Sequence, residues 1–246
     1  MPIIYLSPST QENNYFVSGG TEEAYMNLLA DAMIPYLDAS GIRYTRNTPD
    51  MTAAGAIAQS NAGNYDLHLA LHSNAAPDGK YGSIRGSIVF YYPGSVQGQR
   101  AAQIVADGLK AIYPDPNLVR SEATTSIGEV RFVRAPSVFL ELAFHDNTED
   151  AAWIKNNILV IARNLVLSLT EYFGIPFFER QLNRAGTVDV SYGVLNIRSR
   201  PERSAPIIAR APDGAPLSIM NRFGGWYLVN YNGTVGYAYE DYVRVD

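Results

Sequence analysis

Two polar residues that end apolar runs, His72 and Glu141, are the side chains of this chain best suited to chemistry. Residues 66–74 read Asp-Leu-His-Leu-Ala-Leu-His-Ser-Asn, an apolar run typical of a buried strand that stops at His72. Residues 137–147 repeat the pattern, with Glu141 as the polar group. In open α/β sheets, ligands and reacting groups collect just beyond the carboxyl ends of the strands. An imidazole and a carboxylate at two such ends indicate a metal-assisted hydrolase.

Each of these residues also has a structural interpretation. A lone histidine is often a satisfied structural residue, but the place of His72 at a strand end favours metal ligation. A carboxylate in an apolar strand is costly to bury without a partner. Glu141 is therefore either half of a buried ion pair, for instance with Arg46, or a general base tuned by apolar surroundings, which we favour. His68 lies four strand residues from His72, roughly 13 Å away, which indicates a core or supporting role.

Composition limits the class of protein. The chain has 246 residues, of which 47% are hydrophobic and 17% charged, so a packed core is expected and disorder is not. We expect no membrane span, because no stretch approaches roughly 18 apolar residues, and no secretory signal is visible at the N-terminus. The chain has no cysteine, so any metal must be held by His and carboxylates. The net charge of −5 lacks the clustered basic footprint of a nucleic-acid-binding protein.

The segments that would position His72 and Glu141 alternate between strand and helix. Strands are predicted at residues 3–6, 41–46, 67–72, 86–92 and 138–142. Helices are predicted at 22–39, 52–62, 95–113 and 148–173, with Thr148 as a cap and Gly174 in the stop position. The alternation predicts an α/β domain over residues 1–176, with a mostly parallel sheet and helices on both faces.

The pattern changes after Pro176. Residues 177–186 are predicted to be a linker, and residues 187–246 a small all-β barrel. Short alternating runs at 193–197, 215–222, 226–231 and 235–239 are separated by turn signals such as Asn232-Gly233.

Residues 1–175 resemble the zinc-dependent N-acetylmuramoyl-L-alanine amidases, which cut peptidoglycan. The resemblance rests on four features: Glu23 four residues before Asn27, Thr45-Arg46 after Gly41, Leu-His-Ser-Asn-Ala at 71–75, and Leu-Glu-Leu-Ala-Phe-His-Asp-Asn at 140–147. It implies zinc held by Glu23 and His72, with Glu141 as the catalytic base. It also implies that Arg46 and Asn74 contact substrate.

One zinc ligand of that family is missing. Its first strand is normally followed by Asp-x-Gly-His-Gly, whereas this chain has Ser-Pro-Ser-Thr-Gln at residues 7–11. His145 is the candidate replacement, because four residues of chain span at most about 13 Å and a turn would bring its ring back toward the metal. The alternative is a loop histidine beside Asp146. Gln11 and Glu12 are weaker replacements, since a carboxamide oxygen rarely binds zinc.

Residues 186–246 resemble a bacterial SH3 domain. The resemblance rests on Leu-Asn-Ile-Arg-Ser-Arg-Pro at 195–201, Gly-Trp-Tyr at 225–227 and Val-Gly-Tyr at 235–237. It implies a wall-binding module in which Trp226, Tyr227 and Tyr237 are candidate contacts. Some aromatic residues must fill the barrel core while others line a groove, and the sequence cannot separate the two groups.

Together these features predict a peptidoglycan hydrolase that acts in the cell wall or outside the cell. The bond cut would join the lactyl group of N-acetylmuramic acid to the L-Ala of the stem peptide. The main alternative is an inactive wall-binding or regulatory protein derived from such an amidase. A zinc peptidase that cuts within the stem peptide is a third possibility.

Overall fold

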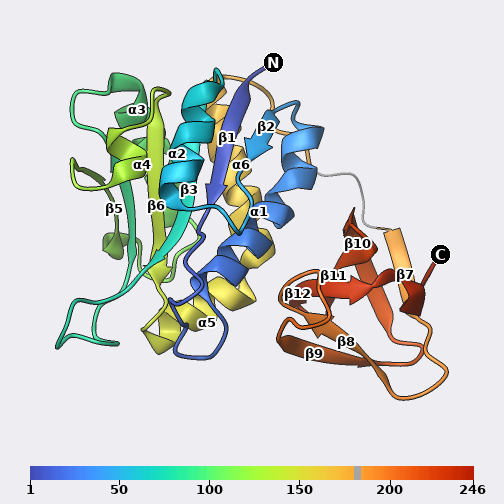
Figure 1. The fold of residues 1–246 in the computed structure, drawn as a ribbon. Coiled ribbons are helices and arrows are strands. Elements are labelled where there is room, and N and C mark those ends of the chain that lie inside the picture. The colour runs from blue at the N-terminus through green and yellow to red at the C-terminus, as the bar shows by residue number, and fades with distance from the viewer. Residues whose placement is uncertain (180–183) are drawn as a thin grey trace. The chain divides into compact units, whose positions relative to one another are not determined.

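The computed structural model describes residues 1–179 and 184–246, which divide into two compact units, Met1–Glu179 and Arg180–Asp246 (Figure 1). The first unit holds one six-stranded sheet with the strand order β2-β1-β3-β6-β4-β5. Its strands are β1 (Ile3–Pro8), β2 (Arg43–Arg46), β3 (Leu67–Asn74), β4 (Ser87–Tyr91), β5 (Val119–Ala123) and β6 (Ser137–Phe144). Strand β4 runs antiparallel to β6 and every other pairing is parallel. The predicted mostly parallel sheet is confirmed.

Helices cover both faces of this sheet. On one face α1 (Glu22–Ala39), α3 (Val96–Lys110) and α6 (Ile158–Phe173) pack together, and on the other α2 (Ala53–Ala62) packs against the short α4 (Gly128–Arg131). A further helix, α5 (Thr148–Asn156), and the 3-10 turn η1 (Pro116–Leu118) complete the unit. No helix in the described part of the chain is long and apolar enough to cross a membrane.

The helix predicted over 148–173 is interrupted. Asn157, with φ −124° and ψ 19°, separates α5 from α6, and its side-chain amide donates to the carbonyl of Trp153 at 2.8 Å. A polar side chain that bonds to its own backbone in this way competes with helical pairing. The cap of α5 is Asn147, whose side chain accepts from the amides of Glu149 and Asp150, rather than Thr148. The predicted stop is correct, because Gly174 adopts the left-handed conformation (φ 66°) at the end of α6.

The second unit is a single antiparallel sheet with the strand order β13-β7-β10-β11-β12-β8-β9. Its elements are β7 (Arg184–Val188), β8 (Val194–Arg198), β9 (Ile207–Pro212), β10 (Pro216–Phe223), β11 (Trp226–Tyr231), β12 (Thr234–Tyr239), the 3-10 turn η2 (Glu240–Tyr242) and β13 (Val243–Val245). All seven strands contribute aliphatic residues to one core, so the sheet curls around that core. The turn at Asn232-Gly233 has positive φ at both residues (49° and 87°), as an Asn-Gly hairpin turn requires.

The structure differs from the predicted linker at residues 177–186. Strand β7 begins at Arg184 and pairs with both β10 and β13, so part of that segment belongs to the C-terminal sheet. Residues 180–183 of the predicted linker lie outside the described residues. The short run Arg-Ala-Gly-Thr-Val lacks the alternation that marked the other strands, which is why β7 was not predicted.

Candidate active site

The site is built where β3 and β6 end side by side. His72 and Glu141 are register partners on these parallel neighbours, so both side chains leave the same face of the sheet. The face also carries Tyr5, His68 and Phe139, and the ring of Phe139 stacks on His72 with centroids 4.2 Å apart. The two residues singled out from the sequence are therefore brought together.

Two carboxylates flank the buried imidazole of His72. Glu22 Oε1 lies 2.8 Å from Nδ1, and Glu129 Oε2 lies 3.4 Å from Nε2. Burial alone would lower the pKa of His72, but its hydrogen bonds to Glu129 and Glu22 raise that pKa to about 10. The two carboxylates therefore favour the protonated form of the His72 ring.

The first turn of α1 positions Glu22. Thr21 caps the helix by accepting from the amide of Ala24 at 3.2 Å, and Glu22 follows as the first helical residue. Its Oε2 accepts from the Asn14 side chain at 2.7 Å, while its Oε1 accepts from the amide of Ser73 at 3.3 Å. Burial alone would raise the pKa of Glu22, but His72, together with hydrogen bonds from Asn14 and Ser9, holds that pKa below its usual range. The carboxylate is ionised and fixed in direction.

The carboxylate beside His72 is therefore Glu22, one residue before the predicted Glu23. Successive helical residues point about 100° apart. The four-residue spacing between Glu23 and Asn27 therefore does not determine whether Glu22 or Glu23 faces the sheet. Glu23 is also buried, at 1% exposure, and its backbone carbonyl accepts from the Asn27 side chain. In the described contacts of His72, the residue of helix α1 that touches its ring is Glu22.

Sequence reasoning missed Glu129, which lies on the short helix α4. Its carboxylate spans two histidines of β3, with Oε1 3.2 Å from His68 Nε2 and Oε2 3.4 Å from His72 Nε2. Burial alone would raise the pKa of Glu129, but the two histidines lower it to about 2. His68 therefore supports the site through Glu129, as its distance from His72 predicted. An acidic residue in a four-residue helix gives no periodic signal, so only the structure reveals it.

Glu141 is the unpartnered member of the group. Its Oε2 is buried and has no hydrogen-bond partner among the described residues. Burial, assisted by the nearby Glu22, raises the pKa of Glu141 to about 8 despite the opposing charge of His72. The alternative interpretation, an ion pair with Arg46, is absent from the described contacts, because Arg46 pairs with Asp31. A buried carboxyl group with high proton affinity and a free oxygen is suited to accept a proton from water.

This high pKa has a measurable effect on stability. A carboxyl whose folded-state pKa exceeds its unfolded value stabilises the fold below the unfolded pKa, and that contribution is lost as pH rises toward 8. In chelator-treated protein, Glu141→Gln should leave the free energy of unfolding nearly unchanged at pH 5 and increase it by several kcal/mol at pH 9, on the order of 1.4 kcal/mol per unit. Urea unfolding at the two pH values measures this. Equal effects at both would show that Glu141 titrates normally.

His145 does not complete the site. Its Nδ1 lies 3.0 Å from both Ser73 Oγ and the Ser73 carbonyl, and its ring packs on Phe16 with centroids 5.6 Å apart. Strand alternation puts Ser73 on the face opposite His72, so the predicted fold-back toward the metal does not occur. Its backbone carbonyl accepts from Val17, which ties the loop after β1 to the end of β6. Gln11 and Glu12 lie on that loop and are exposed, with Gln11 Nε2 3.3 Å from His72 Nδ1.

We therefore expect His145→Ala to act on stability and not on metal binding. Losing the hydrogen bond of His145 to Ser73 leaves a buried polar group of Ser73 without this partner, which costs about 1–3 kcal/mol. Chemical unfolding and elemental analysis of the same preparation measure the two effects. A variant of normal stability that has lost metal would restore His145 to the ligand set.

Arg46 contacts residues of helix α1, Asp31 and Asn27, and has no described contact with His72 or Glu141. Its guanidinium pairs with Asp31 and donates to Asn27 Oδ1 at 2.7 Å, and Asn27 in turn donates to the Ser9 carbonyl at 3.0 Å. This series of hydrogen bonds fixes the position of Ser9, at the start of the loop after β1. Arg46 thus has a structural role. Arg46 and Asn74 are both partly exposed, and both stay predicted substrate contacts.

The side chains around His72 are of types that bind zinc, but few of them point at one place. Imidazole nitrogen and carboxylate oxygen both suit zinc, and Glu22 and His72 present one of each at the same point. The two ring nitrogens point in opposite directions, so Glu22 and Glu129 cannot share one ion with His72. Over residues 1–179 and 184–246, no three His, Asp or Glu side chains form a group that could hold a metal. The unpartnered Glu141 oxygen beside this pair is consistent with an ion or water at that point.

The aromatic residues of the C-terminal unit divide into two groups. Tyr237, a predicted wall contact, is 1% exposed and packs against Phe223, so it serves the interior. Tyr227 packs partly buried against the aliphatic core. Trp226 instead lines a pocket together with tyrosines from β12 and η2. Of the three predicted wall contacts, Trp226 is the one that lines a cavity.

Comparison with known proteins gives consistent matches for both units. Residues 9–171 match the N-acetylmuramoyl-L-alanine amidase family, and residues 193–244 match the bacterial SH3 domain family. No curated protein matches the chain significantly.

Solved structures share the fold of the first unit at low sequence identity. The N-acetylmuramoyl-L-alanine amidase AmiC2 of Nostoc punctiforme superposes with a TM-score of 0.60 at 14% identity, covering 70% of this chain and 97% of that one. The N-acetylmuramyl-L-alanine amidase Ami1 from Mycobacterium smegmatis gives 0.61 at 17% identity, covering 70% and 97%. The catalytic domain of the CD27L endolysin, which targets Clostridium difficile, gives 0.57 at 19% identity, covering 70% and 98%.

Proposed function

The chain belongs to the N-acetylmuramoyl-L-alanine amidase family, and we propose on that premise that it cleaves peptidoglycan by zinc-assisted hydrolysis. The bond cut joins N-acetylmuramic acid to the L-Ala of the stem peptide. The observation that carries the proposal is the convergence of His72, Glu22 and the unpartnered Glu141 at the ends of β3 and β6. The protein works in the cell wall or outside the cell, where this substrate is found.

We assign zinc binding to Glu22 and His72. When bound, zinc supplies a Lewis acid that acidifies water and polarises a carbonyl group. Glu141 takes the proton from the attacking water on Oε2 and passes it to the nitrogen of the leaving L-Ala. The pKa of Glu141 falls when a cation binds beside it, because an opposite charge favours the ionised form. Asn74, at the end of β3, is the proposed contact for the substrate.

Glu129 is assigned a positioning role. A histidine that binds a metal through one ring nitrogen commonly donates from the other to a carboxylate, which fixes its tautomer and direction. Glu129 stands 3.4 Å from His72 Nε2 and is itself held by His68.

We expect Glu129→Gln to lower zinc affinity by about 10- to 100-fold, the usual cost of losing such a partner. Competition with a fluorescent zinc chelator measures the affinity, and circular dichroism checks that the variant is folded. Unchanged affinity in a folded variant would remove Glu129 from the site.

The second candidate function is an inactive wall-binding protein derived from an amidase. It is favoured by the loop after β1, where Gln11 lies beside His72 in place of a ligating histidine. Elemental analysis separates the two, because an inactive site would hold no stoichiometric zinc.

Mass analysis of digested peptidoglycan tests the proposed function. An amidase releases stem peptides that begin with a free L-Ala amine and leaves the glycan strands intact. Shortened peptides still attached to glycan would identify a peptidase that cuts within the stem. An undigested wall would support the inactive alternative.

A further inference from the structure

The side chain of Gln11 lies beside His72 at the edge of the sheet where the reaction is assigned. Gln11 stands on the loop between β1 and α1, which Figure 1 shows in blue beyond the carboxyl end of β1. Its Nε2 lies 3.3 Å from His72 Nδ1, and the residue is exposed. The carboxamide is therefore close to the reaction centre and open to a substrate.

A series of hydrogen bonds fixes which end of the Gln11 carboxamide faces the site. An ionised carboxylate only accepts hydrogen bonds, so the Asn14 atom that lies 2.7 Å from Glu22 Oε2 is the donor Nδ2. The same Nδ2 lies 2.8 Å from the Gln11 carboxamide, so the atom that it contacts there is the acceptor Oε1. The Nε2 amino group of Gln11 is thereby left to face His72.

This amino group has donors that its neighbour cannot accept. Among the described residues, the atom within hydrogen-bond distance of Gln11 Nε2 is His72 Nδ1. That ring nitrogen lies closer to Glu22 Oε1, at 2.8 Å, and a hydrogen bond to a carboxylate requires Nδ1 to carry the proton. Zinc held by Glu22 and His72 would use the same nitrogen. In both cases Nδ1 accepts nothing from Gln11, so the N–H groups of Gln11 are available to a ligand.

The backbone that carries Gln11 is fixed as well. Its amide donates to Ser9 Oγ at 3.2 Å, and the Ser9 amide donates to the Leu71 carbonyl of β3 at 2.9 Å. Further along the loop, the buried ring of Phe16 packs on Tyr25 with centroids 4.8 Å apart. A donor that is already held in place needs little reorganisation when charge develops on a neighbouring oxygen, and such donors stabilise an oxyanion most effectively.

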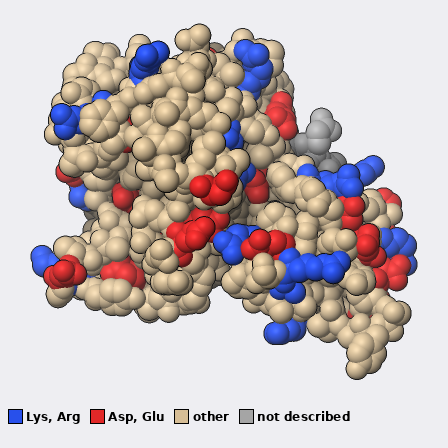
Figure 2. Space-filling model, in the orientation of Figure 1, with Lys and Arg blue, Asp and Glu red and all other residues tan. Residues whose placement is uncertain are grey.

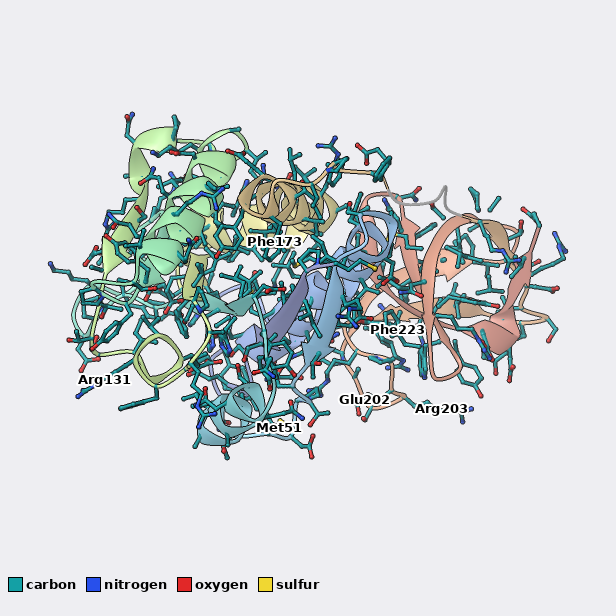
Figure 3. The ribbon with its side chains drawn as sticks, turned by 90° about the horizontal axis from the view of Figure 1, so that it is seen from above. Met51, Arg131, Phe173, Glu202, Arg203 and Phe223 are labelled. Atoms are coloured by element: carbon teal, nitrogen blue, oxygen red, sulfur yellow. The ribbon has the colours of Figure 1, made fainter. Side chains whose placement is uncertain are left out.

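Two arginines on neighbouring elements are turned away from this point. Arg46 of β2 is paired with Asp31. Arg131 of α4 lies over the ring of Phe132 at 5.1 Å, and Figure 3 shows it at the outer side of the unit. On the face shown in Figure 2, acidic and basic side chains are interspersed without one continuous basic surface. The neutral donor Gln11 is thus better placed than either arginine to meet a developing negative charge.

We propose that Gln11 is a catalytic residue whose Nε2 donates a hydrogen bond to the carbonyl oxygen of the scissile amide as that oxygen gains negative charge. The reaction itself is taken from the proposed function. As the oxygen of the attacking water bonds to the carbonyl carbon, the π electron pair moves onto the oxygen beside Gln11, and one proton of the water moves to Glu141. When the carbon–nitrogen bond breaks, this pair re-forms the carbonyl group, and Glu141 gives the proton to the departing nitrogen.

Kinetics on a soluble muramoyl peptide test the proposal. Gln11→Met keeps the length of the side chain but removes both donors, and we expect kcat to fall about 100-fold, the usual cost of losing one such donor. KM and zinc content should be unchanged, because the donor acts on charge that develops only in the transition state. Asn13→Ala removes an exposed carboxamide from the same loop, so it is the matched control and should keep its kcat.

Binding of a transition-state analogue gives a second readout, which needs no cleavage. The probe is a phosphinate in which tetrahedral phosphorus replaces the scissile carbonyl carbon, and the reference is the planar amide itself. Both are titrated by calorimetry into zinc-loaded protein that carries Glu141→Gln, so that nothing is cleaved. Adding Gln11→Met should weaken binding of the phosphinate about tenfold or more and leave binding of the amide unchanged.

Normal kcat in folded, zinc-loaded Gln11→Met protein, or equal affinity for the phosphinate, would overturn the proposal. Loss of zinc from this variant would also overturn it, because Gln11 would then act on the metal through Oε1. If the unmodified protein cleaves and the variant is normal in both assays, only this inference fails. If the unmodified protein does not cleave but phosphinate binding depends on Gln11, the proposed function fails and the donor assignment stands.

Discussion

Replacing Glu141 by Gln lowers the rate of peptidoglycan cleavage by roughly 100- to 10,000-fold, the usual contribution of a general base. The substitution keeps the size and shape of the side chain but removes its ability to accept a proton. Its Oε2 has no described partner, so little structure depends on the charge. The release of soluble fragments from purified cell walls measures the rate.

The control for this variant is its zinc content, which should equal that of the unmodified protein because Glu141 is not assigned as a ligand. Its melting temperature should be equal or higher. Near-normal cleavage by a folded, zinc-loaded Glu141→Gln protein would exclude Glu141 from the mechanism.

The second large effect distinguishes two adjacent glutamates. We expect Glu22→Gln to lower zinc affinity more than about 100-fold, beyond the effect of losing an outer partner, and to abolish cleavage. Glu22 contacts His72 at 2.8 Å, and a carboxamide is a poor substitute for a carboxylate on zinc. Glu23→Gln, on the same helical turn, is the matched variant and should keep its zinc and most of its activity.

Equilibrium dialysis with zinc measures both variants side by side. If Glu23→Gln loses zinc while Glu22→Gln retains it, the family spacing to Asn27 is the better guide and the site has been assigned to the wrong carboxylate. Loss of zinc in both would mean that the two glutamates act together.

The positions of His72 and Glu141 could be predicted from the sequence because they depend on strand patterns. His72 ends the apolar run of β3, Glu141 interrupts the apolar run of β6, and the parallel pairing of the two strands makes them register partners. The bounds of α1 followed from its periodic apolar face and agree with the structure. Patterns of this kind determine which face of an element a residue occupies.

Contacts between distant segments could not be predicted in this way. The choice of Glu22 over Glu23 depends on the rotation of α1 about its axis, which no local signal fixes. Glu129 reaches His72 across 57 residues of chain from a single-turn helix, and its role depends on how α4 packs. The four residues of chain from Glu141 to His145 are long enough for the His145 ring to reach the site. Its hydrogen bonds to Ser73 hold the ring on the opposite face of the sheet instead.

The same distinction applies to the C-terminal unit. Alternation located four of its strands, but seven strands form the sheet. Tyr237 and Trp226 were equivalent in the sequence, and only the curl of the sheet places one in the interior and the other in a pocket.

A crystal structure of zinc-loaded protein, with anomalous scattering recorded at the zinc edge, tests the central claim most directly. The account predicts a single ion bound by Glu22 and His72 at the ends of β3 and β6, with Glu141 facing it and Glu129 bonded to the other ring nitrogen. An ion bound elsewhere, or none under saturating zinc, would contradict it.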